Sequence, residues 1–225
     1  MNQRHQLRYL LTRLLRCSYA QADQFCHSGL VFIDTKVATE PRLIVHENQE
    51  ILVDKQIIRP RLSFRYLLFH KPSGYECTAN PLVENTIYKL LPASFADLFP
   101  LGRLDKNSEG LLLLTNDGKT YRMLMNKTVE IEKEYLVRTK NPINKALEEA
   151  FTKPMLLGQR FTKPAKFEQL DEFNFKVILT EGINRQIRRI CAKSENQVLQ
   201  LTRIRFGQQV LGNLPVGEWI EVEGF

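Results

Sequence analysis

The stretch GRLDKNSEGLLLLTNDG, Gly102 to Gly118, decides the fold. Its polar turn contains Asp105 and, after Gly110, runs into four consecutive leucines, Leu111 to Leu114, before turn residues return. A short apolar run bounded by turn residues is typical of a strand buried on both faces. We therefore expect Asp105 on a loop held by the core of a sheet, where a carboxylate is well placed for chemistry.

The same turn admits two other interpretations. An aspartate in a polar turn before a strand is most often only a turn residue, and spacing alone favours that interpretation for Asp105. Asp105, Asn107 and Glu109 also fit the opening of an EF-hand calcium loop. The position that should supply a bidentate glutamate is occupied by Asn116, so calcium is disfavoured.

Composition points to a folded, basic protein. The 225 residues have room for one sizeable core and a small extra domain, and 43% hydrophobic with 25% charged residues is typical of soluble proteins. The net charge of +7 favours a polyanionic partner, nucleic acid first and an anionic membrane second. A merely basic soluble protein remains an alternative.

Cysteine and histidine usage argues against a metal. The four cysteines form no C-x-x-C pair, and the four histidines do not cluster beside them. No apolar run approaches the roughly 20 residues of a membrane helix. We expect reduced thiols in a cytoplasmic protein with no metal; without a coiled-coil repeat, we also expect a monomer.

The first part of the chain predicts a small module. Leucines recur at helical spacing from Leu7 to Leu15, with Arg4, Arg8, Arg13 and Arg16 on the remaining surface. A capping box of Ser18 and Gln21 starts a second helix, and short strands follow up to Val53. We interpret residues 54–62 as a linker and divide the chain into domains 1–58 and 59–225.

The second part alternates strands and helices. The pattern predicts strands at Phe64–Phe69, from Glu134 and at Phe173–Leu179, and helices capped by Asp117, Asn141 and Asn184. In the last helix we expect Ile187, Ile190 and Cys191 to face inward, with Arg185, Arg188 and Arg189 on much of the opposite face.

Several of these stretches together resemble one family. GRLDKNSEGLLLLTND is similar to the signature of the pseudouridine synthases of the RsuA and RluB/RluE/RluF group, with Asp105 at their catalytic aspartate. Lys71 lies in a similar K-P-x-G element, and Lys133 and Tyr135 match a K-x-Y element whose tyrosine packs against the target base. GINRQIR resembles the third motif, so Arg188 takes the position of the arginine that pairs with the aspartate. Ile183 replaces an arginine common there.

The resemblance implies an α+β protein. A small N-terminal S-four-like RNA-binding domain would precede a larger catalytic domain with a mixed, mainly antiparallel sheet. The implied activity is isomerisation of specific uridines in ribosomal RNA, without cofactor, through catalytic Asp105, Tyr135 and Arg188. The third motif and the brief closing tail look nearer to RluF than to RsuA, which favours large-subunit RNA, with transfer RNA as a second candidate. The residues expected to contact RNA are Arg103, Lys133, Asn184, Arg185, Arg189, Lys71, Arg13 and Arg16.

Two rival functions stay open. The fold could serve a non-catalytic RNA-binding or ribosome-assembly factor that has lost turnover. A phosphatase or glycosidase using Asp105 would need a metal cluster or a second carboxylate, for which Glu109 is the nearest candidate.

Overall fold

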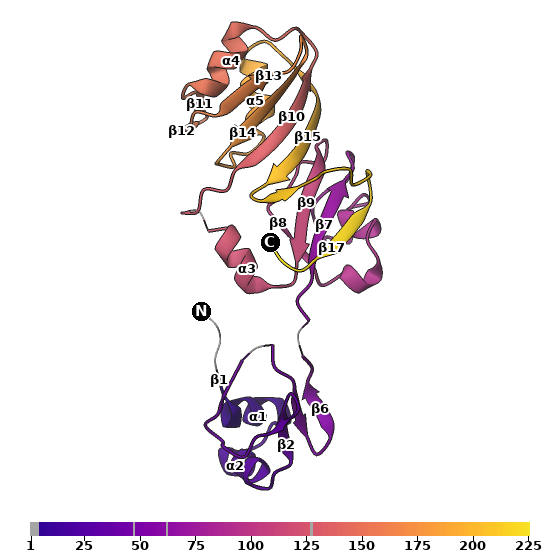
Figure 1. Ribbon diagram of the computed structural model, residues 1–225, viewed down its shortest axis with the longest axis vertical. Helices are drawn as coiled ribbons and strands as arrows, with labels where there is room; N and C mark the ends of the chain where they lie inside the picture. The colour runs from indigo at the N-terminus through magenta and orange to yellow at the C-terminus, as the bar shows by residue number, and fades with distance from the viewer. Residues whose placement is uncertain (1–4, 47, 62, 127) are drawn as a thin grey trace. The chain divides into compact units, whose positions relative to one another are not determined.

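The computed structural model describes residues 5–46, 48–61, 63–126 and 128–225. The chain divides into two compact units, Met1–Phe64 and Arg65–Phe225, drawn as ribbons in Figure 1. The segment predicted as a linker contains strand β6 (Gln56–Arg59), which pairs with β5 (Ile51–Val53) and so extends the first unit. Leu62, also in that segment, lies outside the described residues.

Two short helices build one side of the first unit. The predicted leucine-rich helix is α1 (Leu7–Leu15), which buries Leu7 and Leu11 completely. The predicted capping box is confirmed at α2 (Tyr19–His27), where the Ser18 hydroxyl accepts a hydrogen bond from the Gln21 amide.

The other side of the first unit is a small antiparallel sheet. Its strand order is β3-β2-β5-β6, and a separate pair, β1 with β4, lies beside α1. The remaining strands of this unit are β1 (His5–Gln6), β2 (Val31–Ile33), β3 (Lys36–Val37) and β4 (Ile44–Val45). Helices and sheet share one apolar core, which includes Ala22, Cys26, Val31 and Ile51.

The described residues of the second unit form a nine-stranded sheet. Its path is β13-β14-β10-β15-β9-β7-β17, with β16 paired to β15 and β8 paired to β9. The strands are β7 (Tyr66–Lys71), β8 (Phe99–Leu101), β9 (Glu109–Thr115), β10 (Lys133–Thr139), β13 (Lys166–Gln169), β14 (Asn174–Leu179), β15 (Val198–Phe206), β16 (Gln209–Val210) and β17 (Trp219–Val222); β11 (Leu156–Leu157) and β12 (Arg160–Phe161) form a separate hairpin. The sheet is mixed and mainly antiparallel, as predicted.

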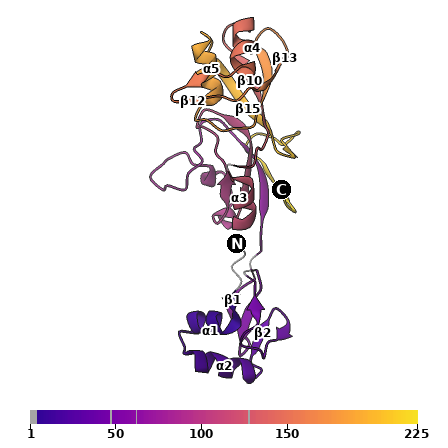
Figure 2. The same cartoon turned by 90° about the vertical axis from the view of Figure 1, so that its left-hand side faces the viewer.

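The sheet consists of two halves that meet at β15 and β9. Among the described neighbouring strands, β15 and β9 are the ones that run parallel, through two residue pairs, Thr202 with Glu109 and Arg203 with Gly110. Figure 2 shows helices α4 and α5 with the β10–β15 half and α3 with the other half, as does Figure 1. We call the line where β15 meets β9 the seam.

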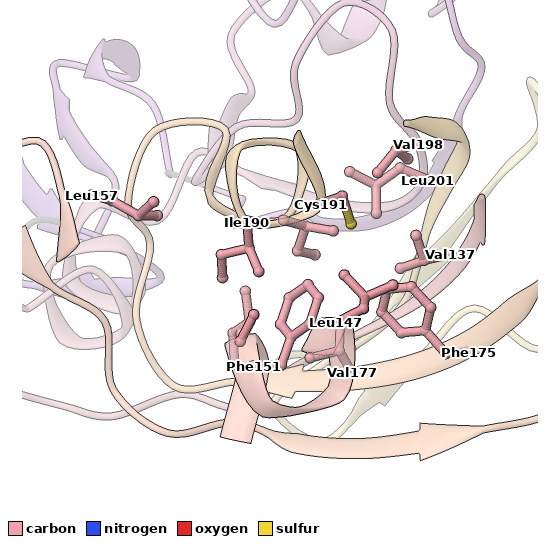
Figure 3. Packing of buried hydrophobic residues seen from close by; sticks show 13 residues of the cluster. Val137, Leu147, Phe151, Leu157, Phe175, Val177, Ile190, Cys191, Val198 and Leu201 are labelled. Carbon is pink, nitrogen blue, oxygen red and sulfur yellow. The ribbon is translucent and has the colours of Figure 1, made fainter. Parts of the chain in front are cut away.

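Helices α4 (Lys145–Thr152) and α5 (Gln186–Lys193) close the core of the β13-β14-β10-β15 half. Figure 3 shows Leu147 and Phe151 of α4 and Ile190 and Cys191 of α5 packed with sheet residues such as Phe175. The inward stripe predicted for α5 is confirmed, because Ile187, Ile190 and Cys191 are buried.

Two predicted helix caps are wrong. Asn144, not Asn141, caps α4 by accepting from the Leu147 amide. Helix α5 begins one residue later than Asn184 would require, because Arg185 adopts a left-handed backbone conformation at φ 51° and ends the preceding turn.

The four leucines of β9 form the centre of the other half. Leu112 and Leu114 pack on one face of the sheet, while Leu111 and Leu113 pack on the opposite face. All four are at most 1% exposed, which confirms the strand buried on both faces. The predicted helix after Asp117 is α3 (Gly118–Leu124), and two single turns, η1 (Ile87–Lys89) and η2 (Ala93–Phe95), cover one face. Among the described residues, no helix has both the length and the apolar character of a membrane span.

Candidate active site

A large pocket opens at the seam. Its volume is about 880 Å³, and its lining comes from the loop before β9, from β10 and β15, and from the turn before α5. Asp105, Tyr135 and Arg185, which lie far apart in the sequence, all face this pocket. Six predicted site residues line it: Arg103, Asp105, Lys133, Tyr135, Asn184 and Arg185.

A buried lysine, Lys71, supports the loop that contains Asp105. The Lys71 ammonium donates to the carbonyls of Ser108 at 2.7 Å, Asp105 at 3.2 Å and Lys106 at 3.3 Å, besides its neighbour Pro72. The Gly74 amide donates to the same Lys106 carbonyl at 2.7 Å. These bonds fix the backbone of the loop that carries the Asp105 carboxylate.

The prediction that Lys71 contacts RNA is wrong. The side chain is 0% exposed, because its stem passes through the core next to β9 and its ammonium is saturated by backbone oxygens. Burial lowers the pKa of Lys71, and the Asp105 charge opposes that shift. Lys71 is therefore a structural support of the loop.

The ion pair at Asp105 comes from Arg185. The Arg185 Nη1 atom lies 3.6 Å from the Asp105 Oδ2 atom, and both side chains keep contact with solvent at 46% and 31% exposure. The left-handed backbone of Arg185 turns this residue toward the pocket just before α5 starts. The Gln186 side chain holds the turn by donating to the Glu181 carboxylate at 2.7 Å.

The predicted ion pair between Arg188 and Asp105 is not present in the described residues. Arg188 instead donates to the Asn107 carbonyl at 2.5 Å and to the Val198 carbonyl at 3.2 Å. Burial lowers the pKa of Arg188; the Arg185 charge adds to the shift and the Asp105 charge opposes it. Arg188 thus joins α5 to the Asp105 loop and to β15, while Arg185 takes the exposed position at the carboxylate.

Four side chains form the sheet face of the pocket. Tyr135 and Arg203 are direct cross-strand partners on β10 and β15, and Lys133 and Phe206 are the second pair along, beyond Glu134 and Arg205. The Arg203 guanidinium lies 5.2 Å from the centre of the Phe206 ring, and the Lys133 ammonium lies 5.6 Å from it. An aromatic ring on a floor with two cations suits a planar, electron-rich ligand.

The remaining predicted RNA contacts lie on different parts of the chain. Arg103 is exposed at the pocket, and Arg189 is half-buried on α5 and donates to the Asn184 carbonyl at 3.5 Å. Arg13 and Arg16 are exposed in the first unit. Arg4 lies outside the described residues.

Sequence reasoning missed two lining residues. Arg203 is 2% exposed and belongs to the pocket floor, although an arginine in LTRIRF looks like an ordinary edge residue. Phe161 is 68% exposed at the pocket on the β11–β12 hairpin, next to Arg160. The alternation of basic and aromatic residues in QRFTK was the available signal for Phe161.

In the described part of the chain, no group of three or more histidine, cysteine or acidic side chains is arranged to hold a metal ion. All four cysteines are free, and burial raises the pKa of the Cys77 thiol in the pocket wall. The site offers the Asp105 carboxylate beside several cations and an aromatic face, with Glu76, Glu130 and Glu181 also in the pocket lining, which suits nucleophilic or acid–base chemistry on a polyanion.

Comparisons with known proteins point to one family. The profile of the RNA pseudouridylate synthase family matches residues 65–193. The dual-specificity RNA pseudouridine synthase RluF of Escherichia coli K12 is 33% identical over 205 residues, which cover 90% of this chain and 70% of RluF. The ribosomal large subunit pseudouridine synthase B of Haemophilus influenzae is 33% identical over 229 residues, covering 96% and 64%. A crystal structure of a pseudouridylate synthase superposes with a TM-score of 0.68 at 27% identity, covering 97% of this chain and 96% of that one.

Proposed function

Because this chain belongs to the RNA pseudouridylate synthase family, we propose that it isomerises uridines of ribosomal RNA to pseudouridine, with Asp105 as the catalytic carboxylate. The observation that carries the assignment of the site is the pocket itself. It gathers Asp105, Arg185 and Tyr135 from three separate segments around a space of about 880 Å³. Pockets of roughly 300–1,000 Å³ are typical for small-molecule ligands, so one extruded nucleotide fits.

The reaction moves one bond and leaves the composition unchanged. The bond between ribose C1′ and uracil N1 breaks, the base turns, and C1′ bonds to C5 instead. C5 loses its proton and N1 gains one, so no oxidant, reductant or cofactor is consumed. The protein has to extract the base, hold it while it turns and supply a carboxylate as nucleophile or base.

We assign a role to each site residue from its place around the pocket. Tyr135 stacks on the extruded uracil, since aromatic stacking contributes roughly 1–3 kcal/mol per base. Arg185 steers the Asp105 carboxylate, and the exposed side chain of Arg103 binds a neighbouring phosphate. Arg188 forms no ion pair with Asp105 and holds its loop through the Asn107 carbonyl, so we assign it as a positioning residue rather than the partner of the carboxylate.

The N-terminal unit is proposed to bind RNA as an S-four-like domain. Its two helices on a small sheet carry Arg13 and Arg16 on the exposed surface, and the net charge of the chain is +7. Such cations bind phosphate without reading sequence. The name of the Haemophilus influenzae relative favours ribosomal RNA of the large subunit as substrate, and the dual specificity in the name of RluF favours a second target, for which we propose transfer RNA. We propose that the protein acts as a cytoplasmic monomer.

The decisive test of function is a map of pseudouridine. Total RNA from cells with and without the gene should differ at one or a few uridines of ribosomal RNA, detected by mass spectrometry. Adding the purified protein to RNA from the deletion strain should restore those sites. RNA that is bound by the pure protein yet never gains pseudouridine would identify a non-catalytic RNA-binding factor and refute the proposal.

A further inference from the structure

Arg203 has a buried side-chain nitrogen that finds no hydrogen-bond partner among the described residues. The side chain is 2% exposed, and its Nε atom donates to the Leu111 carbonyl at 2.7 Å. Its Nη2 atom is buried and makes no hydrogen bond. A buried charged donor without an acceptor costs free energy, so the Nη2 atom requires an explanation, and a bound ligand is one that its place in the pocket allows.

The unpaired donor lies where a base would stack. Arg203 and Tyr135 are directly opposite each other on adjacent antiparallel strands, so their side chains lie on the same face of the sheet. Both line the pocket that contains Asp105. The guanidinium is held there by the Leu111 carbonyl and by the Phe206 ring.

The surroundings of Arg203 are positive. In the described part of the chain no carboxylate forms an ion pair with Arg203 or with Lys133, the next cation on this face. Burial and then the charge of Arg203 lower the pKa of Lys133, and Glu181 opposes that shift more weakly. Two cations without an ion-paired carboxylate on the floor of the pocket favour a ligand that carries or develops negative charge.

We propose that the Arg203 Nη2 atom donates to a ring carbonyl oxygen of the target uracil and stabilises the base while it is detached from the ribose. This inference rests on the proposed function. When the C1′–N1 bond breaks, its electron pair stays on the uracil and is shared between N1 and the ring oxygens. A guanidinium N–H at one of these oxygens binds that charge more strongly than it binds the neutral base. The pair is returned when C5 bonds to C1′, and the C5 proton leaves as N1 takes one up.

Because Arg203 is buried, we expect its ligand to be the base rather than a phosphate of the RNA backbone. Phosphates remain on the solvent side of an extruded nucleotide, where exposed cations such as Arg103 and Arg185 are available. A side chain that is 2% exposed and shares its face with Tyr135 is reached by the base alone.

The test compares Arg203→Met and Arg203→Lys with a matched control. Arg205→Met is the control, because Arg205 lies on the same strand, pairs with Glu132 and Glu134, and does not line the pocket. The readouts are the single-turnover rate of pseudouridine formation at saturating RNA, the Kd for RNA at two salt concentrations, and the Tm. We expect Arg203→Met to lower the rate by about 100-fold, the size found for removal of one oxyanion donor, with the Kd changed less than about twofold. Arg205→Met should leave the rate within about twofold.

A change in the substrate makes the test independent of folding. Replacing the O2 or O4 oxygen of the target uridine by sulfur weakens it as an acceptor. One of the two replacements should slow the wild-type protein, and the same replacement should have a smaller effect on Arg203→Lys. Equal effects on both proteins, or an unchanged rate in Arg203→Met, would overturn the inference. A raised Kd with a smaller salt slope and a normal rate would instead make Arg203 a phosphate ligand. If the wild-type protein forms no pseudouridine at all, the proposed function fails rather than this inference alone.

Discussion

The backbone of Arg203 lies against Gly110 so closely that a β-carbon on Gly110 would come within 2.3 Å of the Arg203 carbonyl oxygen. The two residues are partners in the short parallel pairing of β9 with β15. Gly110 also has a φ of 105°, a conformation that side chains rarely adopt. A glycine at the start of β9 therefore allows the two halves of the sheet to join, and this seam brings the Asp105 loop next to Tyr135.

Replacing Gly110 by alanine should disrupt the seam. Because the added carbon would collide with backbone on β15 and the φ would be strained, we expect a loss of at least about 1–3 kcal/mol in the free energy of unfolding. Thermal and urea unfolding measure it. Gly224→Ala is the control, since nothing lies within 4 Å of its added carbon. Equal stability of the two variants would show that β9 and β15 are not packed as described.

Removing the Lys71 ammonium should loosen the Asp105 loop. Lys71→Met leaves the Ser108 and Asp105 carbonyls without this donor in a buried place, which costs roughly 1–3 kcal/mol. We expect a lower Tm and a strongly reduced isomerisation rate. Hydrogen exchange gives the local readout, because the Ser108 amide donates to the Asp105 carbonyl within this loop. Unchanged protection of Ser108 together with full activity would contradict the structural role of Lys71.

Substitutions of Arg185 and Arg188, the two arginines of the third motif, should affect the Tm differently. Arg188→Met should lower the Tm, because the Asn107 and Val198 carbonyls lose a charged donor. Arg185→Met should leave the Tm nearly unchanged, since an ion pair between half-exposed side chains contributes little to stability, yet it should slow isomerisation. Melting curves and turnover of both variants measure this. The reverse order of stabilities would place Arg188 at the carboxylate after all.

RNA affinity should depend on the protonation of Lys133. Burial, followed by the charge of Arg203, lowers the pKa of this ammonium below its ordinary value of 10.5. A cation with a lowered pKa is lost earlier as pH rises, so RNA affinity should fall on the alkaline side before an ordinary lysine would titrate. In Lys133→Arg that part of the fall should disappear, because arginine stays charged. The measurement is Kd against pH for both proteins on the same RNA, which cancels titration of the RNA. Identical profiles would remove Lys133 from the RNA contacts.

Local signals in the sequence predicted much of the fold. The leucine run of β9, the capping box of α2 and the inward stripe of α5 depend on periodicity and short-range hydrogen bonds, and the structure has all three. The site was less accessible to such reasoning. Which arginine reaches Asp105 depends on the left-handed conformation of Arg185, and the burial of Arg203 depends on strand partners from distant segments. Residue spacing alone predicts neither the partner of Asp105 nor the burial of Arg203.

The burial of Lys71 shows the same limit. The resemblance of its K-P-x-G element places Lys71 at the RNA pocket and makes it a candidate RNA contact. The stem lies instead beneath the loop that follows more than thirty residues later, where backbone carbonyls replace water as partners of the ammonium. Residue type alone therefore does not distinguish a lysine that supports a loop from one that binds phosphate.

The central claim, that Asp105 carries out the isomerisation, is tested most directly by Asp105→Asn, which keeps the shape of the side chain and removes its charge. The measurement is single-turnover formation of pseudouridine in ribosomal RNA, with the Tm and the Kd for the same RNA as controls. The account predicts no detectable pseudouridine, with the Tm and the Kd close to those of the wild-type protein. Substantial turnover by Asp105→Asn would contradict it.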